Sequence, residues 1–451
     1  MANYVLLERI TVGANGASSI SFNNIPQTGY TDLKLVCSTR TNRALTNDYL
    51  KIAFNSGSSY SGIQLAGSGS GVSSGTFSGI GATQYAGDIN GATSTSNTFT
   101  SADIYIPNYT SSNAKSYSVD STMENNATAA YSSLDAGLWS GTGAITTIAL
   151  APGVGTAFAQ YSTFSLYALA AVGTTPVKAP KAIGGDIIQT DGTYWYHAFL
   201  SSGSFTPQTA LSCDVLVVAG GGGGGATGGG GGGAGGLYYA TSQALTANTL
   251  QAVVVGAGGT GGNGSSGAVG TNGGNSSFGS ISGTIYGGGY GGTFSTKQGA
   301  SGGSGGGNER TLTSVGGTGT SGQGNNGAAG TNPNVGGGGG GAAQAGNTSS
   351  AGYGGNGTYN SLTDGAGALL GLGQLSSGHY YFAGGGGAGS TNGSGITASG
   401  GLGGGANGIK ETGVPSAATP NTGGGGGSSG TGDTNNGSVG GSGLVIIRYA
   451  Y

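Results

Sequence analysis

The stretch Asp214-Val-Leu-Val-Val-Ala-Gly-Gly-Gly-Gly-Gly-Gly225 joins two unlike kinds of sequence. Its first residues are apolar and β-branched, which is typical of a short buried strand. Its glycines open a block, residues 220–443, that holds 85 Gly in 224 positions and only seven charged residues. The block ends at a second apolar run, Leu444-Val-Ile-Ile-Arg-Tyr449. We expect the two runs to be neighbouring strands of one small sheet that brackets the glycine-rich block.

The glycine-rich block is expected to be ordered. A flexible Gly-rich linker would not need a matched strand at each end, and the block also contains distinct apolar segments. Runs of six glycines break the Gly-X-Y repeat of collagen, and too few aspartates are present for a calcium-binding β-roll. A β-solenoid would need stacked Ile, Val and Leu, which the runs lack. The remaining structure is a bundle of extended polyglycine-II helices, with three residues per turn and no internal hydrogen bonds. Because glycine has no Cβ, such helices can approach until each bonds to its neighbours.

Residues 1–172 have the pattern of an all-β domain. Short alternating apolar runs are separated by Gly, Asn and Ser clusters, which indicates a β-sandwich, jelly-roll-like in its strand number. At about 170 residues the domain can bury its own core. The expected strands are Tyr4–Val12, Ser18–Ile25, Asp32–Thr39, Tyr49–Asn55, Ala102–Tyr109, Lys115–Ser121, Leu134–Trp139, Ile145–Leu150 and Thr163–Leu169.

A linker at 173–186, rich in Pro, Gly and Lys, precedes a β-hairpin signal. Asp191-Gly192 lies between the runs Ile187–Thr190 and Thr193–Phe199, and Asp-Gly between two β-rich runs predicts a tight hairpin. The predicted fold class is therefore all-β, in three parts. These are a β-sandwich (1–172), a linker with a hairpin and strand platform (173–219 with 444–451), and a polyglycine-II bundle (220–443) closed by the last strand.

Composition excludes several classes of function. The 451 residues include 108 Gly, carry a net charge of −3, and are only 6% charged, against about 25% in typical proteins. No basic stripe for nucleic acid is present. Two His and two Cys leave few groups that titrate near neutral pH, so we expect no enzyme, no cofactor and no metal site. There is no apolar run of about 18 residues and no secretory signal at the start, which predicts no membrane insertion and synthesis in a cytoplasm. Cys37 and Cys213 are expected to be ordinary strand residues, and a single disulfide between them is the alternative.

Two catalytic motifs occur only by composition. Gly302-Gly-Ser-Gly-Gly306 matches G-x-S-x-G without a strand-to-helix context, and G-x-G-x-x-G recurs without a βαβ unit. His197 alternates within the predicted hairpin and is expected to be packed. Aromatic loop residues of the glycine-rich block are the candidates for recognition, because Tyr combines an apolar face with a hydroxyl group; the alternative is that they only cover the ends of the lattice. The candidates are Tyr286, Tyr290, Phe294, Tyr353, Tyr359, His379, Tyr380, Tyr381 and Phe382.

Several segments of the sequence also resemble segments of a known protein family. The run Asp214–Gly225, the segment Ser276-Ser-Phe-Gly279 and the ending Gly440–Tyr449 resemble the glycine-rich domain of phage tail proteins. The hairpin Asp191–His197 resembles the module that commonly precedes that domain. Residues 1–172, with Asp103–Asn113 and Glu124–Tyr131, resemble the N-terminal β-domain of structural proteins of marine phages.

The resemblance implies a non-enzymatic virion protein on the tail or capsid surface. A tail fibre or receptor-binding adhesin is expected, with residues 1–172 contacting other virion proteins and residues 220–443 contacting a bacterial surface glycan or outer-membrane protein. Fibres of this kind are often trimers, although a polyglycine lattice can also satisfy its hydrogen bonds within one chain. The alternatives are a capsid-decorating fibre or a purely structural spacer. An ice-binding protein would need a regular Thr/Ala face, which this sequence does not have. A depolymerase would need paired acidic residues, which no one segment contains.

Overall fold

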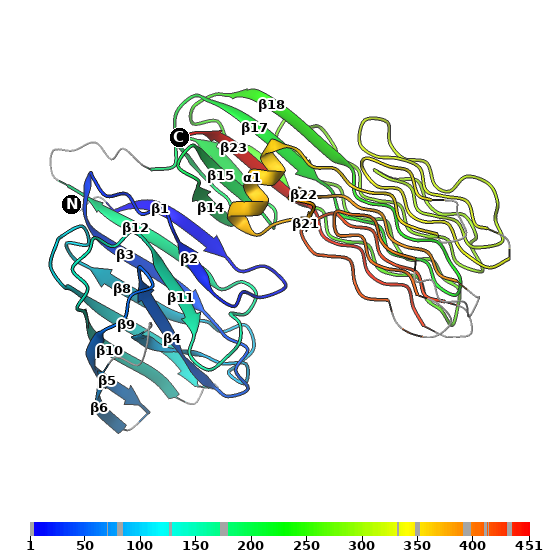
Figure 1. Ribbon diagram of the computed structural model, residues 1–451. Helices are drawn as coiled ribbons and strands as arrows, with labels where there is room; N and C mark the ends of the chain where they lie inside the picture. Colours follow the sequence, from blue (N-terminus) through cyan, green and yellow to red (C-terminus); the bar gives the residue numbers. More distant parts are fainter. Residues whose placement is uncertain are drawn as a thin grey trace. The chain divides into compact units, whose positions relative to one another are not determined.

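The computed structural model describes residues 4–69, 71–78, 84–125, 129–171, 179–331, 333–347, 352–390, 398–409, 413, 415–430 and 435–451. Its regular structure is mostly β, with a single helix among these residues (Figure 1). The chain divides into two compact units. We call Met1–Pro180, Asp186–Trp195 and Tyr451 the N-terminal unit, and Lys181–Gly185 with Tyr196–Ala450 the glycine-rich unit. Residues 173–178 of the predicted linker lie outside the described residues.

The N-terminal unit contains a large antiparallel sheet and a smaller one. The large sheet has the strand order β14 (Ile187–Thr190), β1 (Tyr4–Thr11), β12 (Thr163–Ala170), β3 (Tyr30–Thr39), β8 (Thr100–Ile106), β9 (Lys115–Asn125), β10 (Ala129–Trp139), β5 (Tyr60–Ser68) and β6 (Gly71–Ser78). The smaller sheet has the order β2 (Ile20–Phe22), β11 (Ile148–Pro152), β4 (Asn47–Phe54) and β7 (Gln84–Asn90).

One hydrophobic core joins these two sheets. Phe54 of β4 is completely buried, and its ring lies 5.6 Å from that of Tyr117 on β9 and 5.8 Å from that of Trp139 on β10. Leu35 and Leu166 of the large sheet are buried in the same cluster. The alternating apolar residues of the predicted strands therefore face inward, as the period of two requires.

The expected strands of residues 1–172 all have counterparts in the structure, but three observed strands were not predicted. These are β5, β6 and β7, which lie between Tyr60 and Asn90. β5 and β6 are rich in Ser and Gly, and β7 contains Gly, Asp and Asn; all of these residues are typical of loops or depleted in strands. They form strands because they pair with neighbours in the sheets: β5 aligns with β10 over nine residue pairs, from Tyr131↔Ser68 to Trp139↔Tyr60.

The predicted hairpin is confirmed. Strands β14 and β15 (Tyr194–Phe199) are adjacent and joined at Asp191-Gly192. The carboxylate Oδ1 of Asp191 accepts hydrogen bonds from the backbone N–H of Thr193 at 2.8 Å and of Tyr194 at 2.7 Å. Gly192 has φ +87°, a left-handed conformation that favours glycine.

The glycine-rich unit also begins and ends in strands, as expected. β17 (Leu211–Val218) pairs antiparallel with β23 (Leu444–Ala450), from Val218↔Leu444 to Cys213↔Tyr449. The sheet of this unit has the order β18 (Leu237–Leu245), β17, β23 and β15. A second sheet contains β13 (Ala182–Ile183), β16 (Gly203–Pro207), β19 (Gln251–Val254) and β20 (Ser277–Phe278), and a two-stranded hairpin contains β21 (Gln374–Ser376) and β22 (His379–Tyr381).

His197 lies in the packed core of these sheets, which confirms its expected role. It is completely buried, with Nδ1 2.6 Å from the carbonyl oxygen of Gly184 and Nε2 2.9 Å from the hydroxyl of Tyr449. Burial lowers the pKa of His197 to about 4, although the hydrogen bond to Gly184 opposes the shift. The ring is therefore neutral at physiological pH. Cys37 and Cys213 are both buried free thiols, as predicted.

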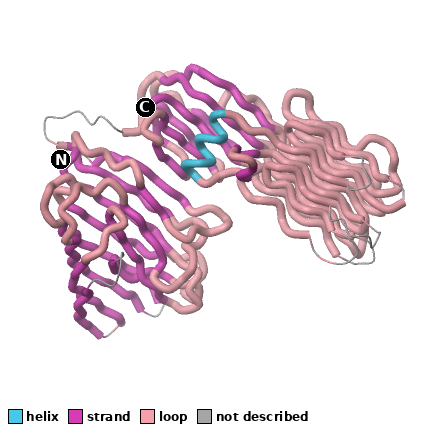
Figure 2. The backbone as a smooth tube through the Cα atoms, in the orientation of Figure 1, coloured by secondary structure: helices cyan, strands magenta, loops and turns pink. Residues whose placement is uncertain are grey.

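Beyond the sheets, the glycine runs lie side by side as extended backbone without strand or helix assignment (Figure 2). Consecutive N–H groups of one run donate to three neighbouring segments in rotation, with a period of three residues. In the first run, residues 220 and 223 donate to segment 271–274, residues 221 and 224 to segment 438–441, and residues 222 and 225 to segment 230–233.

The same period appears in two further runs. Residues 230–235 donate in rotation to segments 289–292, 337–340 and 423–426, and residues 384–389 donate to segments 403–406, 352–355 and 229–232. The donor–acceptor distances in these three runs are 2.8–3.1 Å, which is ordinary for N–H···O bonds. Each run is thus surrounded by three other segments, most of which lie far from it in the sequence.

The glycine positions of these runs leave no room for a side chain, and the only other residues in the runs are Ala234 and Ala388. A Cβ on Gly222 would lie 2.2 Å from the carbonyl oxygen of Gly289, and one on Gly223 would lie 1.8 Å from that of Thr260. Both contacts are with backbone atoms that are themselves hydrogen-bonded, so neither can move aside cheaply. Here glycine is required by close approach rather than by unusual backbone angles.

We predict that Gly222→Ala destabilises the glycine-rich unit by at least about 1–3 kcal/mol, the usual cost of overpacking. Limited proteolysis followed by mass spectrometry should detect cleavage within residues 200–450 at a lower temperature in this variant than in the parent protein. Gly143→Ala is the control, because a Cβ there meets no atom within 4 Å. Equal proteolysis profiles for the two variants would contradict close packing of the runs.

Candidate functional site

The single helix lies inside the glycine-rich block, where only β structure and polyglycine were expected. α1 (Ser361–Leu370) begins after Asn360, whose side-chain oxygen accepts from the N–H of Leu362 and Thr363, while the Thr363 side chain accepts from the N–H of Asn360. This is a capping box, and the helix ends at Gly371 with φ +68°. The all-β prediction was therefore wrong at this segment, because two internal glycines concealed a capped helix.

Those two glycines have a packing reason. A Cβ on Gly367 would lie 2.0 Å from Cγ of Tyr380, and one on Gly365 would lie 2.3 Å from the hydroxyl oxygen of Tyr196. Each glycine destabilises the helix by about 1 kcal/mol relative to alanine. Because the Cβ is absent, the ring of Tyr380 can pack directly on the helix backbone. The sequence signal that could have revealed the helix is Asn360 at the cap with Asp364 in the first turn.

Asp364 connects α1 to the hairpin β21–β22. Its Oδ2 lies 2.8 Å from Nδ1 of His379, and its Oδ1 accepts a 2.9 Å hydrogen bond from the backbone N–H of Tyr380. One carboxylate thus fixes two adjacent residues of β22. Arg448 of β23 contacts the first residue of the helix. Its guanidinium group donates to the carbonyl oxygen of Ser361 at 3.0 Å and forms an ion pair with the carboxylate of Asp214 on β17, with 2.5 Å between Nη2 and Oδ2.

Three candidate residues form one aromatic cluster on this support. The ring of Tyr359 stacks on that of His379 at 3.9 Å and 22°, and meets that of Tyr381 edge-on at 4.9 Å and 63°. Tyr359 is 42% exposed, and His379 and Tyr381 are half-buried. We call Tyr359, His379 and Tyr381 the aromatic cluster. Its rings offer a flat apolar face beside hydroxyl and imidazole groups.

The remaining candidates are placed differently. Phe382 is completely buried, so it packs beneath the hairpin and cannot contact a partner at the surface. Tyr380 is half-buried against Gly367. Tyr286, Tyr290, Phe294 and Tyr353 lie on other segments of the block; Phe294 covers Gly267, and Tyr286, Phe294 and Tyr353 are exposed. The sequence candidates therefore do not form a single patch.

A buried acidic pair in the N-terminal unit was missed by the sequence reading, which looked for paired carboxylates within one segment. Asp88 of β7 and Asp135 of β10 interact electrostatically. Burial, reinforced by the Asp88 charge, raises the pKa of Asp135 to about 7, and burial also raises that of Asp88. Oδ1 of Asp135 is buried without a hydrogen-bond partner. Only the fold could reveal this pair, because 47 positions separate the two residues in the sequence.

Among the described residues, no group of three or more His, Cys, Asp or Glu side chains is placed to hold a metal ion. Within the same residues, no helix has the length and hydropathy needed to cross a bilayer.

The support under the aromatic cluster gives a first prediction. Asp364→Ala removes both acceptors and should loosen β22 by about 1 kcal/mol, because the pair is partly solvated. Hydrogen exchange of residues 374–382 should accelerate. Asp364→Asn retains an acceptor for the N–H of Tyr380 and should show a smaller effect. Unchanged exchange in both variants would contradict the role of Asp364 as the support.

The acidic pair gives a second prediction. A carboxyl group whose pKa rises on folding is stabilising when protonated, so its contribution is lost as the pH increases. Asp135 should therefore cost the N-terminal unit up to roughly 1.4 kcal/mol of stability for each pH unit between about pH 4 and pH 7, in addition to the contribution of Glu8, whose pKa is also raised. Asp135→Asn should flatten this dependence in thermal melts followed by tryptophan fluorescence. A parallel pH profile for variant and parent would contradict the raised pKa.

Comparison with known families agrees with the composition of the second unit. A family model described as a glycine-rich domain matches residues 200–450. Comparison with curated protein sequences and with solved structures gives no significant match. The family match covers more than half of the chain, including the strands β17 and β23 and all the glycine runs between them. The chain therefore belongs to the glycine-rich domain family.

Proposed function

We propose that the glycine-rich unit is a polyglycine-II bundle that serves as a rigid scaffold. The period of three in the donor rotation of residues 220–225, 230–235 and 384–389 supports this proposal, because a polyproline-II-type helix has three residues per turn. Successive N–H groups then point to successive neighbours around the helix axis. Ordering each glycine costs roughly 1–2 kcal/mol, so the bundle is stable only when almost every such bond is made.

The scaffold gives its connections a fixed geometry. Binding residues often lie on loops that a rigid framework positions. The aromatic cluster is such a place: it is held between a capped helix and a hairpin, and Asp364 fixes it from below. Aromatic faces next to hydroxyl groups suit the rings of a saccharide or an exposed protein surface.

We propose that the protein is a bacteriophage virion component, a tail fibre or receptor-binding adhesin, without enzymatic activity. The observation that carries the proposal is a glycine lattice, bracketed by β17 and β23, that presents the aromatic cluster. The resemblance of the bracketing strands and the hairpin to phage tail proteins adds the virion context. The partner would be a bacterial surface glycan or outer-membrane protein, and the second candidate is a structural spacer or capsid-decorating fibre.

In this proposal the N-terminal unit is a jelly-roll-like β-sandwich that anchors the protein to other virion proteins. One face of its large sheet leaves apolar side chains exposed at the edge formed by β10, β5 and β6. These side chains are Ile63, Leu65, Val72 and Leu134, exposed by 57–86%. Apolar groups gathered in this way mark interaction surfaces in soluble proteins.

The adhesin proposal predicts the effect of a surface substitution. Virions carrying Tyr359→Ala, His379→Ala and Tyr381→Ala together should adsorb to host cells at least tenfold more slowly, because the aromatic contact surface is lost. Virions carrying Tyr161→Ala, which removes an exposed tyrosine of the N-terminal unit, should adsorb normally. Adsorption is measured as the decline of free infectious particles.

Electron microscopy of the same particles is the control for assembly. Antibodies against the glycine-rich unit should label intact virions of all variants. Normal adsorption of the triple variant with normal labelling would favour the spacer or decorating fibre. Absence of labelling on purified virions would contradict a virion location altogether.

A further inference from the structure

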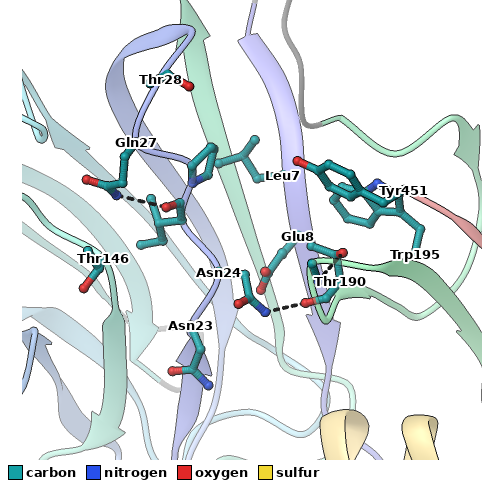
Figure 3. A pocket seen from close by; sticks show the side chains of 13 residues that line it. Leu7, Glu8, Asn23, Asn24, Gln27, Thr28, Thr146, Thr190, Trp195 and Tyr451 are labelled. Atoms are coloured by element: carbon teal, nitrogen blue, oxygen red, sulfur yellow. Dashed lines mark hydrogen bonds between the residues drawn. The ribbon is translucent and has the colours of Figure 1, made fainter.

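The N-terminal unit contains a cavity of about 380 Å³ with a buried acid in its wall (Figure 3). This volume is within the range of small-molecule sites. The lining comes from β1, from the loop 23–28 and from the hairpin β14–β15 with Tyr451. All of these residues belong to the same compact unit. The lining contains the carboxyl group of Glu8 but no Lys, Arg or His side chain.

Glu8 is the unusual residue of this cavity. It is only 3% exposed, and Figure 3 shows it next to Asn24 and Thr190. Its Oε2 accepts a long hydrogen bond, 3.4 Å, from the side-chain amide of Gln189. Its Oε1 has no hydrogen-bond partner among the described residues. A buried carboxylate without a cation or several donors is costly, and burial raises the pKa of Glu8 to about 8 although the Gln189 bond opposes the shift.

The side-chain amides of Gln27 and Asn24 donate to backbone carbonyl oxygens. Both N–H groups of Gln27 are directed to carbonyl oxygens, of Ile25 at 2.9 Å and of Ile145 at 3.0 Å. The amide of Asn24 donates to the carbonyl oxygen of Thr190. Figure 3 shows the Asn24 side chain beside that of Glu8, where its oxygen remains as an acceptor, whereas the Gln27 side chain lies farther from Glu8.

The apolar part of the cavity is aromatic and rigid. The ring of Trp195 stacks on that of Tyr451 at 6.2 Å and 13°, and the backbone N–H of Tyr451 donates to the carbonyl oxygen of Thr193 at 2.9 Å. Leu7 and Pro26 complete the apolar surface. Aromatic rings next to a carboxylate are a favourable environment for an organic cation.

We propose that this cavity binds a primary ammonium group, with Glu8 as its counter-ion and with the proton of the Glu8 carboxyl group released to solvent on binding. An ammonium group has three N–H donors and no acceptor, which suits the carboxylate of Glu8 and the side-chain oxygen of Asn24, and it supplies the positive charge that the cavity lacks. The group could belong to an amino sugar or to a lysine side chain. This site is separate from the aromatic cluster and does not depend on the adhesin proposal.

Matched pairs of small probes test the charge requirement. Isothermal titration of the full chain at pH 7 should show saturable binding of glucosamine but not of glucose. It should likewise show binding of Nα-acetyl-lysine amide but not of Nα,Nε-diacetyl-lysine amide. Binding of either charged probe supports the site, and the tighter one identifies the source of the group. Tetramethylammonium, which has the charge without N–H donors, should bind at least tenfold more weakly.

Substitution of Glu8 tests the assigned residue. Glu8→Gln preserves the shape and should weaken the binding of the charged probe at least tenfold. Asp120→Asn removes an exposed carboxylate from the same unit and should not change the affinity. If Glu8→Gln does not fold, the indole N–H resonance of Trp195 in the unaltered protein decides, because it should shift with glucosamine and not with glucose. Equal binding of charged and neutral probes, no binding of either, or unchanged affinity in Glu8→Gln would overturn the proposal.

Discussion

The glycine-rich unit depends on one constraint: each backbone run must approach its neighbours closely enough to share hydrogen bonds on three sides. Buried N–H and C=O groups need partners, and an extended run without internal bonds must find all of them in other segments. The run 220–225 finds its acceptors in segments that begin at 230, 271 and 438. A Cβ added to a glycine of these runs would meet a carbonyl oxygen at about 2 Å. The high glycine content and the close packing of the runs therefore follow from the same requirement for hydrogen bonds.

This constraint explains where the larger side chains occur. They are excluded from the interior of the runs and collect where the chain reverses or leaves the lattice. The segment 357–382 is the clearest example, since it leaves the lattice, forms α1 and the hairpin β21–β22, and returns at the glycines after Phe382. Phe382 anchors that return by being completely buried, while Tyr359, His379 and Tyr381 stay accessible. A capped helix, an ion pair and a ring stack then stabilise a surface that glycine alone could not build.

The sequence predicted the features that depend on a local pattern of residues or on two apolar runs that flank the glycine-rich block. Alternation identified most strands of residues 1–172, Asp191-Gly192 predicted the hairpin, and the two apolar runs that flank the glycines predicted the β17–β23 pair. It failed where tertiary contacts override local preference. Strands β5 and β6 form from Ser- and Gly-rich sequence, and β7 from sequence with Gly, Asp and Asn, because neighbouring strands pair with them. Helix α1 keeps Gly365 and Gly367 because Tyr196 and Tyr380 need the space. The acidic pair Asp88–Asp135 and the cavity at Glu8 are assembled from distant segments, so no local pattern could reveal them.

The central claim is that the glycine runs are a rigid hydrogen-bonded lattice, and amide hydrogen exchange of the intact chain tests it most directly. Residues 220–225 and 230–235 should exchange slowly, like the paired residues of β17 and β23, because their N–H groups donate within the protein. The exposed residues 313–315 should exchange faster. Rapid exchange of 220–225 and 230–235, at the rate of a solvated polyglycine chain, would contradict the lattice and leave the aromatic cluster without its scaffold.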